Sequence, residues 1–217
     1  MLLALTLGCS VGSISDPWGT SPLETAFYVQ QVGDERDEAW LLLSNGYVSS
    51  PCESIDPEAV AEDYAAWSEE VGVALGREGA RLVLAHLYRF RRSSWEGVFQ
   101  LSSEPVNAVL DDRSPFAAEA GYYAVLEAEA DQNGLAMTYE PVVTQLEVGI
   151  DEGYFEVKSA RDDQLRGSFA LETVDVGGRF EAERCYADFE TTLLPFVLGL
   201  LDGGEGLDGD PSPDTGA

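Results

Sequence analysis

Short segments in which polar and apolar residues alternate recur along this chain, and this pattern is the feature that most limits its fold. Between residues 81 and 90, Leu82, Leu84, His86 and Tyr88 share one face, while the intervening residues share the other. Successive side chains of a β-strand point to opposite faces, so a two-residue period predicts a strand. A short apolar run can also continue a preceding helix, and that alternative stays open for this segment.

Further strands are predicted wherever β-forming residues are bounded by turn signals. The predicted strands cover residues 26–32, 40–43, 95–101, 121–129, 135–140, 142–148, 154–159, 165–171 and 176–182. Asn45-Gly46 and the run from Asp131 to Gly134 are turn signals, and the second is of the kind that joins hairpins. The last two strands each contain the pattern Gly-x-Phe-x-hydrophobic and are predicted to pair as a hairpin, whereas residues 104–118 are predicted to form a loop.

One helix is predicted, from Pro57 to Gly76. Asp56 is a favourable N-cap residue, and proline is well tolerated at the first helical position. The apolar residues of this segment recur at three- and four-residue intervals and form one stripe: Val60, Tyr64, Trp67, Val71 and Ala74. We expect this stripe to pack against a sheet. The predicted fold class is therefore α+β, mainly antiparallel β, as a single sandwich or open-barrel-like domain over residues 23–201 with one packed amphipathic helix.

The chain is strongly acidic, with 40 acidic residues against 12 basic ones and a net charge of −28. Only five of the acids lie in residues 202–217, so the acidity belongs mainly to the folded body. Such a surface repels the phosphates that nucleic-acid binding must neutralise with basic groups, which excludes nucleic acid as a partner. It also repels anionic lipid headgroups, so attachment to a membrane needs another device.

Five of the basic residues are arginines that lie close together in the sequence: Arg77, Arg81, Arg89, Arg91 and Arg92. In a protein with this excess of acids, we expect their guanidinium groups to pair with neighbouring carboxylates. A surface that binds an anionic ligand or partner is the alternative interpretation of this cluster.

The first residues of the chain form an apolar run that ends in Gly8 and Cys9. This start resembles the signal peptide of bacterial lipoproteins, in which a small residue precedes the cysteine that receives lipid. Thr6 stands where those proteins usually have an aliphatic residue. The hairpin of Gly-x-Phe strands followed by Cys185 adds to a similarity with uncharacterised bacterial lipoproteins, a set without a common activity. The resemblance implies a signal-peptide remnant at residues 1–8 and a multiply acylated Cys9.

The same resemblance implies an exported protein of the bacterial cell envelope, anchored at the outer membrane or cell surface through lipid on Cys9. Several acyl chains are needed, because a single chain binds a membrane only marginally. Residues 9–22 are predicted to be a flexible lipidated tether, since the stretch from Ser10 to Pro22 is rich in Ser, Gly and Pro. The alternative is a hydrophobic N-terminal strand in which Cys9 is buried.

The chain has three cysteines, an odd number that needs an explanation in an exported protein. If Cys9 carries lipid, Cys52 and Cys185 remain as a pair, and oxidising compartments favour a disulfide between them. Cys52 follows an early predicted strand and Cys185 ends the last one, which also favours pairing. The alternative is two separate buried thiols.

No catalytic residue, metal site or cofactor is predicted. His86 is the only histidine, and its apolar neighbours favour a buried, hydrogen-bonded side chain over a catalytic one. The chain contains no phosphate-binding loop of the Gly-x-x-x-x-Gly-Lys type. Calcium is the one cation with candidate ligands, in the acidic tail, but residues 202–217 lack the EF-hand spacing and are predicted to be disordered.

Two classes of function remain. The first is an envelope protein without enzymatic activity, which has a structural role or mediates interactions with a protein or glycan partner. The second is a small-ligand or glycan-binding module whose barrel mouth is lined by Trp40, Trp95 and Tyr122. A hydrolase is the third choice, and it requires His86 to be exposed in a cleft beside a serine or a pair of carboxylates.

Overall fold

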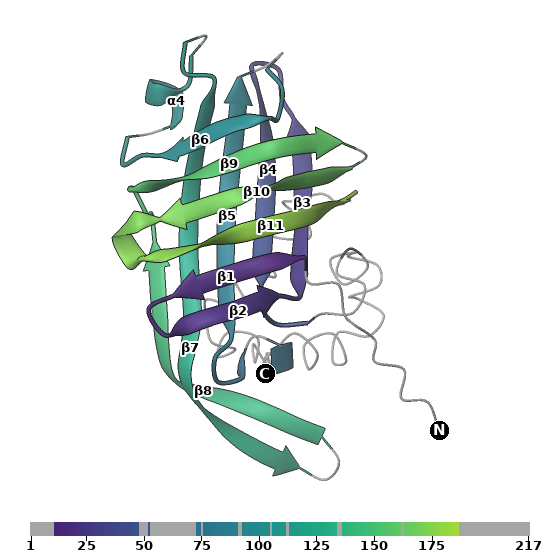
Figure 1. Ribbon diagram of the computed structural model, residues 1–217, viewed down its shortest axis with the longest axis vertical. Coiled ribbons are helices and arrows are strands. Elements are labelled where there is room, and N and C mark those ends of the chain that lie inside the picture. Colours follow the sequence, from purple (N-terminus) through teal and green to yellow (C-terminus); the bar gives the residue numbers. More distant parts are fainter. Residues whose placement is uncertain are drawn as a thin grey trace, which may run out of the picture.

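The computed structural model describes residues 11–47, 52, 73–74, 76–90, 93–104, 106–111, 113–133, 136–161 and 163–186, which fold mainly into β-strands (Figure 1). The strands are β1 (Gly12–Asp16), β2 (Gly19–Leu23), β3 (Thr25–Val32), β4 (Arg36–Ser44), β5 (Arg81–Phe90), β6 (Gly97–Leu101), β7 (Phe116–Asn133), β8 (Ala136–Val148), β9 (Gly153–Arg161), β10 (Gln164–Leu171) and β11 (Val176–Cys185). The short helix α4 (Val106–Val109) precedes β7, and the 3-10 turn η1 (Glu172–Val174) connects β10 to β11.

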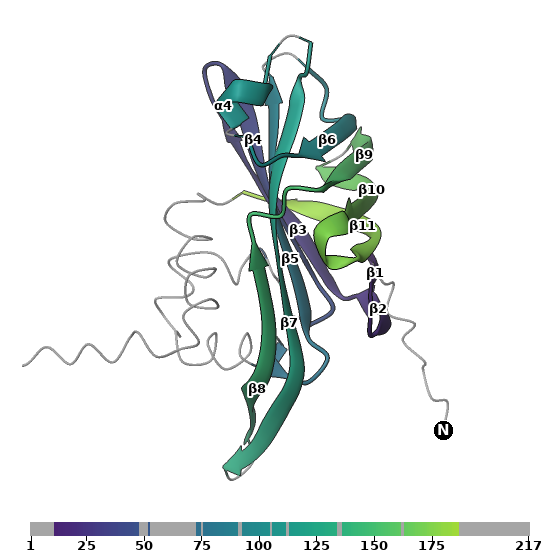
Figure 2. The ribbon, with the colours of Figure 1, turned by 90° about the vertical axis from the view of Figure 1, so that its left-hand side faces the viewer.

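Eight of the strands close into a barrel, in the order β3-β4-β5-β7-β6-β9-β10-β11. β11 completes the ring, because it pairs with β10 along one edge and with β3 along the other. The pairings of β6 with β7 and of β11 with β3 are parallel, whereas the rest of the ring is antiparallel. In Figures 1 and 2, β3, β4, β5 and β7 run along the long axis of the molecule, and β6, β9, β10 and β11 cross them as a second layer.

Three strands lie outside this ring. β1 and β2 form a hairpin, and β1 pairs with the first half of β11, along the edge whose second half pairs with β3. β8 pairs with β7 from Gly121 to Asn133, and the long β7–β8 hairpin projects beyond the barrel (Figure 1). The other edge of β8 has no partner among the described strands.

The interior of the barrel is filled with apolar side chains from both layers. β7 contributes small residues, such as Ala118 and Ala120, and the crossing strands contribute large rings. These rings are at most 3% exposed and come from Phe99, Phe155, Phe169 and Phe180. Each ring contributes on the order of 1.5–3 kcal/mol relative to an exposed ring. The alanines leave room for the rings, so the described interior is a packed core.

The predicted fold class is wrong. The described residues form a closed β-barrel instead of an α+β sandwich or open barrel, and no amphipathic helix packs on the sheet among them. Of the predicted helix Pro57–Gly76, the structure describes Val73, Ala74 and Gly76, which have helical backbone, and the rest lies outside the described residues. Closure of the barrel depends on long-range pairings such as that of β11 with β3, and local periodicity contains no information about them.

The predicted flexible tether is also wrong for the residues of it that the structure describes, because β1 and most of β2 lie within it. Ile14 of β1 and Leu23 of β2 are fully buried in the core, although their neighbours are mainly Ser, Gly and Pro. A Cβ atom added at Gly178 of β11 would lie 2.0 Å from the carbonyl oxygen of Ser13, so the absence of a side chain lets β1 approach. The composition of this segment therefore did not indicate that it forms two paired strands.

The predicted hairpins are confirmed. β3 pairs with β4 around an acidic loop, and β10 pairs with β11 along the two Gly-x-Phe segments. β5 is a strand over Arg81–Phe90, which decides between the strand and helix interpretations of that segment. The predicted strands at 135–140 and 142–148 are one strand, β8, and the predicted loop at 104–118 contains α4 and the start of β7.

Candidate functional site

The predicted disulfide is confirmed: Cys52 and Cys185 are bonded, with their Cα atoms 5.0 Å apart. Cys9, predicted to carry lipid, lies outside the described residues. Cys185 ends β11 and begins a row of residues that crosses the outer face of the barrel, the face opposite the core. The row continues across β3, β4, β5 and β7 as Val29, Trp40, His86 and Glu119.

His86 occupies the centre of a polar cluster on this outer face and is only 7% exposed. Its ring stacks on Trp40, with the centroids 3.5 Å apart. Nε2 lies 2.9 Å from a carboxylate oxygen of Glu38, and Nδ1 lies 2.6 Å from the hydroxyl of Tyr88. That hydroxyl also lies 2.8 Å from a carboxylate oxygen of Glu119. The prediction of a buried, hydrogen-bonded histidine is confirmed.

The hydrogens of His86 and Tyr88 can be placed in two ways in this cluster. Burial, together with the charge of Arg36, lowers the pKa of His86 to about 3, so the ring is neutral at pH 7 and has one N–H. If Nε2 holds the hydrogen, the ring donates to Glu38 and accepts from Tyr88, whose single hydrogen is then not available to Glu119. If Nδ1 holds it, Tyr88 donates to Glu119, and the contact with Glu38 requires a proton on that carboxyl group.

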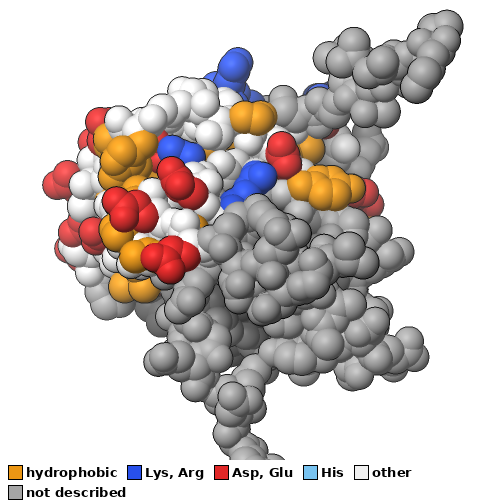
Figure 3. Space-filling view, turned by 90° about the horizontal axis from the view of Figure 1, so that it is seen from below, with side chains coloured by type: hydrophobic (Ala, Val, Ile, Leu, Met, Phe, Trp, Pro, Cys, Tyr) orange, Lys and Arg blue, Asp and Glu red, His pale blue; other side chains and the backbone are white. Residues whose placement is uncertain are grey.

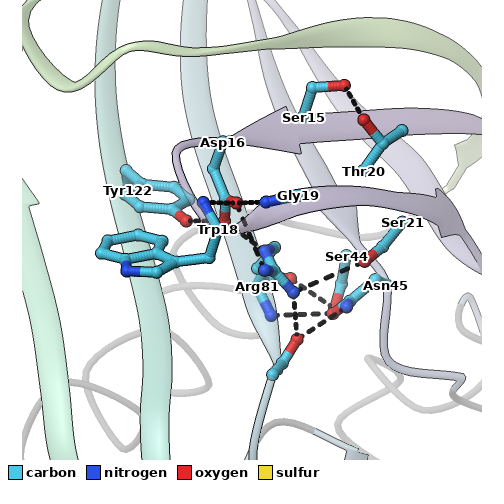
Figure 4. Close-up of polar contacts among 11 residues, drawn as sticks. Ser15, Asp16, Trp18, Gly19, Thr20, Ser21, Ser44, Asn45, Arg81 and Tyr122 are labelled. Atoms are coloured by element: carbon cyan, nitrogen blue, oxygen red, sulfur yellow. Dashed lines mark hydrogen bonds and ion pairs between the residues drawn. The ribbon is translucent and has the colours of Figure 1, made fainter.

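A second polar cluster lies on the core side of β5, at the β1–β2 turn (Figure 4). The side chain of Asp16 is fully buried and forms an ion pair with Arg81. Tyr122 donates a hydrogen bond to the same carboxylate at 2.8 Å, and the backbone N–H groups of Trp18 and Gly19 donate at 2.9 Å and 3.0 Å. Asp16 thereby connects β1 to β5 and β7.

The charges of this second cluster are balanced. Arg81 also donates to the carbonyl of Gly79 at 2.7 Å, and its backbone N–H donates to the side-chain oxygen of Asn45 at 2.7 Å. Burial raises the pKa of Asp16, but the hydrogen bonds from Arg81 and Tyr122 and the charge of Arg81 lower it by more. The pKa of Asp16 therefore lies below its ordinary value, and the carboxylate is ionised. Such an arrangement fixes the turn in place and leaves no reactive group.

The predicted pairing of the arginine cluster is confirmed for two of its members. Arg81 pairs with Asp16, and Arg89 pairs with the buried Asp37 at 2.6 Å. These two guanidinium groups therefore neutralise carboxylates of the protein itself, as the first interpretation of the cluster proposed. Residues 91–92 lie outside the described part of the chain.

The three aromatic residues predicted to line a barrel mouth do not meet. Trp40 stacks on His86 on the outer face. Trp95 and Tyr122 belong to the packed core and are 8% and 1% exposed. That set of residues therefore forms no ligand site, because core packing occupies the space that a ligand would need. His86 is buried, so it also does not meet the condition set for a hydrolase.

A groove of about 750 Å³ lies between β8, the β1–β2 turn and the connection from β10 to β11. Its lining residues are Pro17, Trp18, Leu126, Thr144, Gln145, Leu146, Glu147, Thr173, Val174 and Asp175. Trp18 is 52% exposed and Leu146 is 46% exposed, so accessible apolar surface borders the groove. Figure 3 views this end of the molecule and shows acidic side chains among hydrophobic ones on the described surface.

The groove runs beside an open strand edge. No described strand pairs with the outer edge of β8, which faces the viewer in Figure 2. Four hydrophobic residues between positions 142 and 148 of β8 are exposed, namely Val142, Val143, Leu146 and Val148. Natural edge strands are usually protected by Lys, Pro, bulges or a covering element. Pro141 of β8 and the register shift at Glu127 of β7 lie at one end of the exposed stretch, and residues 142–148 contain neither Lys nor Pro. This combination of groove and open edge is the candidate functional site.

Sequence reasoning missed this site. It predicted a strand at residues 142–148 but gave Trp18 no role, because Trp18 lies in the segment interpreted as a tether. The run of β-branched residues without a basic residue or proline was a usable signal for an open edge. The groove itself was not visible in the sequence, because its walls come from three segments that only the folded chain brings together.

The chain has no match among protein-family models, curated proteins or solved structures. Within the described residues, no group of three or more His, Cys, Asp or Glu side chains is placed to hold a metal ion. In the same part of the chain, no helix is long and apolar enough to cross a membrane.

Proposed function

We propose that this protein is an exported, lipid-anchored protein of the bacterial cell envelope that binds a partner through the groove beside β8. The observation that carries the binding function is the position of the groove along an edge of β8 with which no described strand pairs. An exposed tryptophan lines the groove, and exposed hydrophobic side chains lie on the same edge strand, β8. Exposed apolar patches and unprotected strand edges are typical of interaction sites, because both attract other chains.

The cysteines support the proposed location. Disulfides persist in oxidising compartments outside the cytoplasm, and the bond between Cys52 and Cys185 leaves Cys9 as the one remaining cysteine. Gly8 precedes Cys9, as in the lipoproteins that the start of the chain resembles. Acyl chains on Cys9 would attach an acidic protein whose own surface repels anionic lipids.

The chemistry of the groove favours binding without catalysis. Its described lining includes no His, Cys, Ser or Lys, and the titratable groups there are the carboxylates of Glu147 and Asp175. His86, the one histidine of the chain, is buried in the outer-face cluster and does not line the groove. The described part of this surface therefore offers no imidazole, thiol or amine to act as nucleophile or base.

Trp18 favours a second candidate function, the binding of a glycan. An exposed indole offers a large flat surface to the apolar faces of sugar rings, and neighbouring polar groups can bond to sugar hydroxyls. Thr144, Gln145, Thr173 and Asp175 supply hydroxyl, amide and carboxylate groups in the same groove.

Intact-mass analysis of the full chain extracted from a bacterial membrane tests the proposed anchor. We expect a chain that begins at Cys9 and carries diacyl or triacyl mass, and we expect this mass to be lost in Cys9→Ala. Reduction should add two hydrogens, because Cys52 and Cys185 are bonded. A soluble product that keeps Met1 would contradict the anchor.

NMR spectra of the isotope-labelled full chain test the proposed binding function with two panels of defined probes, oligosaccharides and short extended peptides. A bound probe should shift the indole N–H of Trp18 and the backbone amides of β8. Val98 of β6 is 43% exposed and does not line the groove, so its amide is the control that should stay unchanged. If neither panel shifts Trp18, the binding function is contradicted.

A further inference from the structure

We propose that the ligand of the groove is an extended, positively charged peptide segment of another protein, which adds to the open edge of β8 as a further strand. This inference rests on the proposed binding function and specifies the ligand of the same groove. Three properties of the site support it: the backbone edge of β8 that no described strand pairs with, the direction of the side chains in the groove, and the charge around them.

The backbone of β8 supplies the pairing surface. Thr144–Val148 lies in regular register with Gly121–Val125 of β7, and the register shifts only beyond this stretch, around Glu127. In an antiparallel edge strand, alternate residues direct their N–H and C=O groups away from the paired neighbour. Five residues span about 17 Å, which is enough for a peptide of similar length to form a ladder of hydrogen bonds.

The register also shows which side chains of β8 face the groove. Gln145 pairs with Ala124, and Glu147 pairs with Tyr122, and both partners direct their side chains into the core. Gln145 and Glu147 therefore project from the same face of the hairpin, toward the groove that they line with Trp18. Every second side chain of an added strand would enter the groove, and the others would point to the opposite face.

The groove is suited to positive charge. Glu147 and Asp175 line it, and no Lys or Arg is among the described residues of the lining. The amide oxygen of Gln145 is buried and accepts no hydrogen bond within the described residues, so it can accept one from a ligand. A lysine or arginine side chain would pack its apolar stem on Trp18 and bring its charged end to the carboxylates.

The same charge argues against a second copy of this chain as the added strand. Two molecules that each carry a net charge of −28 repel one another. Pairing two β8 edges would also add one Glu147 from each copy to the shared surface, and residues 142–148 contain no basic side chain to compensate. A basic segment from another protein removes this repulsion.

A glycan would use only part of the site. It could stack on Trp18 and bond to the polar side chains, but sugar hydroxyls do not have the regular spacing of strand N–H and C=O groups. The backbone edge from Thr144 to Val148 would then stay unpaired. A peptide uses both the edge and the groove, so the geometry favours it.

The test uses a capped heptapeptide in which lysine alternates with valine, titrated calorimetrically into the full chain. Two further peptides have the same sequence with N-methyl groups on either the odd or the even residues. In an added strand only one of these two sets of N–H groups faces β8. We therefore expect one methylated peptide to bind at least about tenfold more weakly, through loss of several hydrogen bonds, and the other to bind like the parent peptide.

Two protein variants test the role of the acidic groups. Glu147→Gln combined with Asp175→Asn should weaken the parent peptide about tenfold and reduce the salt dependence of binding. Asn suits position 175, where the backbone φ is +53°. The matched control combines Glu24→Gln with Glu183→Gln, which neutralises two exposed acids outside the groove and should leave the affinity within about twofold.

The outcomes separate this inference from the proposed function on which it rests. Equal binding by the two methylated peptides would overturn strand addition and leave simple charge attraction. Shifts of Trp18 that only oligosaccharides produce would overturn the peptide ligand and keep the binding function. If no probe of either panel shifts Trp18, the proposed function itself fails.

Discussion

β5 carries one polar cluster on each face of the barrel wall, and the two clusters accommodate charge differently. On the core side, Arg81 forms an ion pair with the fully buried Asp16, which also accepts a hydrogen bond from Tyr122. On the outer side, the buried His86 lies beside the carboxylate of Glu38, and the pKa of His86 is lowered. A guanidinium group keeps its charge at every ordinary pH, so it can be buried only beside a group of opposite charge. An imidazole can instead be buried in its neutral form, after it loses its proton.

The two clusters also connect different parts of the chain. The core cluster joins the β1–β2 turn to β5 and β7, and β1 pairs with neither of those two strands. The outer cluster joins β4, β5 and β7, which the backbone ladder already holds together. We therefore expect the core cluster to contribute more to the free energy of unfolding, and the outer cluster to contribute more to its pH dependence near neutrality.

The row of residues on the outer face ends at Cys185, which forms the disulfide with Cys52. Removal of this disulfide is expected to have the largest effect on the free energy of unfolding. The bond joins residues 133 positions apart, and closure of so long a loop restricts the unfolded chain. Replacing Cys52 and Cys185 by serine should lower the free energy of unfolding by about 5 kcal/mol. Urea unfolding of the double variant measures this, with the chemically reduced parent as the control. If the oxidised parent and the variant unfold at the same urea concentration, the expectation is contradicted.

Arg81→Ala should produce the next largest effect. It leaves the buried carboxylate of Asp16 without its cation, and breaking a buried pair in this way costs about 3–5 kcal/mol. Asp16→Asn should cost a similar amount. The double variant Asp16→Asn with Arg81→Met should cost clearly less than the two single effects added together, because it removes both charges. Additive effects in a double-mutant cycle would show that the two side chains do not act as a pair.

Arg166 provides the matched control for Arg81. It pairs with Glu181 at 2.8 Å, but the side chains are 56% and 42% exposed. Water solvates both ions in the folded protein, so Arg166→Ala should lower the free energy of unfolding by less than about 1 kcal/mol. If Arg81→Ala and Arg166→Ala lower the free energy of unfolding equally, burial is not the reason why Arg81 stabilises the fold.

The alternation of β5 indicated a strand and showed which side chains share a face with His86, because the side-chain direction in a strand is a local property. It left the helical alternative open and did not show that this face lies outside the barrel. The partner of Arg81 was not predictable in the same way. Asp16 lies 65 residues earlier, in a segment whose composition indicated a tether. The pair exists because β1 packs on β11, and that contact depends on closure of the whole barrel.

The closed barrel and the groove share this dependence on long-range contacts. The parallel pairing of β11 with β3 joins residues 183–185 to residues 27–29, and no local pattern encodes it. The groove needs the β1–β2 turn, β8 and η1 to be in their folded positions before its walls meet. Local patterns therefore predicted most strands and hairpins, whereas the closure and the candidate site needed the folded structure.

The acid sensitivity of the two clusters should differ in its pH range. The pKa of His86 is lowered from 6.5 to about 3, so between these values the unfolded chain binds a proton that the folded chain does not. Stability is therefore lost as the pH falls, by up to about 1.4 kcal/mol per pH unit from this residue. Between pH 6.5 and 5, the parent should lose about 1.6 kcal/mol more than His86→Gln, because the unfolded histidine is half protonated at the start of this range.

The pKa of Asp16 is lowered as well, but from an ordinary value of 3.8. The contribution of Asp16 to the free energy of unfolding is complete above pH 3.8. It is lost only as the pH falls from that value through the lowered pKa of the folded state. Chemical unfolding of the parent and of His86→Gln at a series of pH values separates the two ranges. Parallel curves for the two proteins between pH 6.5 and 5 would contradict the neutral, buried state of His86.

The smallest effect is expected at Trp18, two residues from Asp16. Its side chain is 52% exposed and lines the groove, and its backbone N–H, which bonds to Asp16 at 2.9 Å, remains in Trp18→Ala. The free energy of unfolding should therefore change by less than about 1 kcal/mol, compared with several for Asp16→Asn. A loss as large as that of Asp16→Asn would show that the indole supports the buried cluster. An unchanged free energy of unfolding would show that the buried cluster still holds the turn in place. Weaker binding of the peptide probe by Trp18→Ala would then be due to loss of the contact between the indole and the peptide.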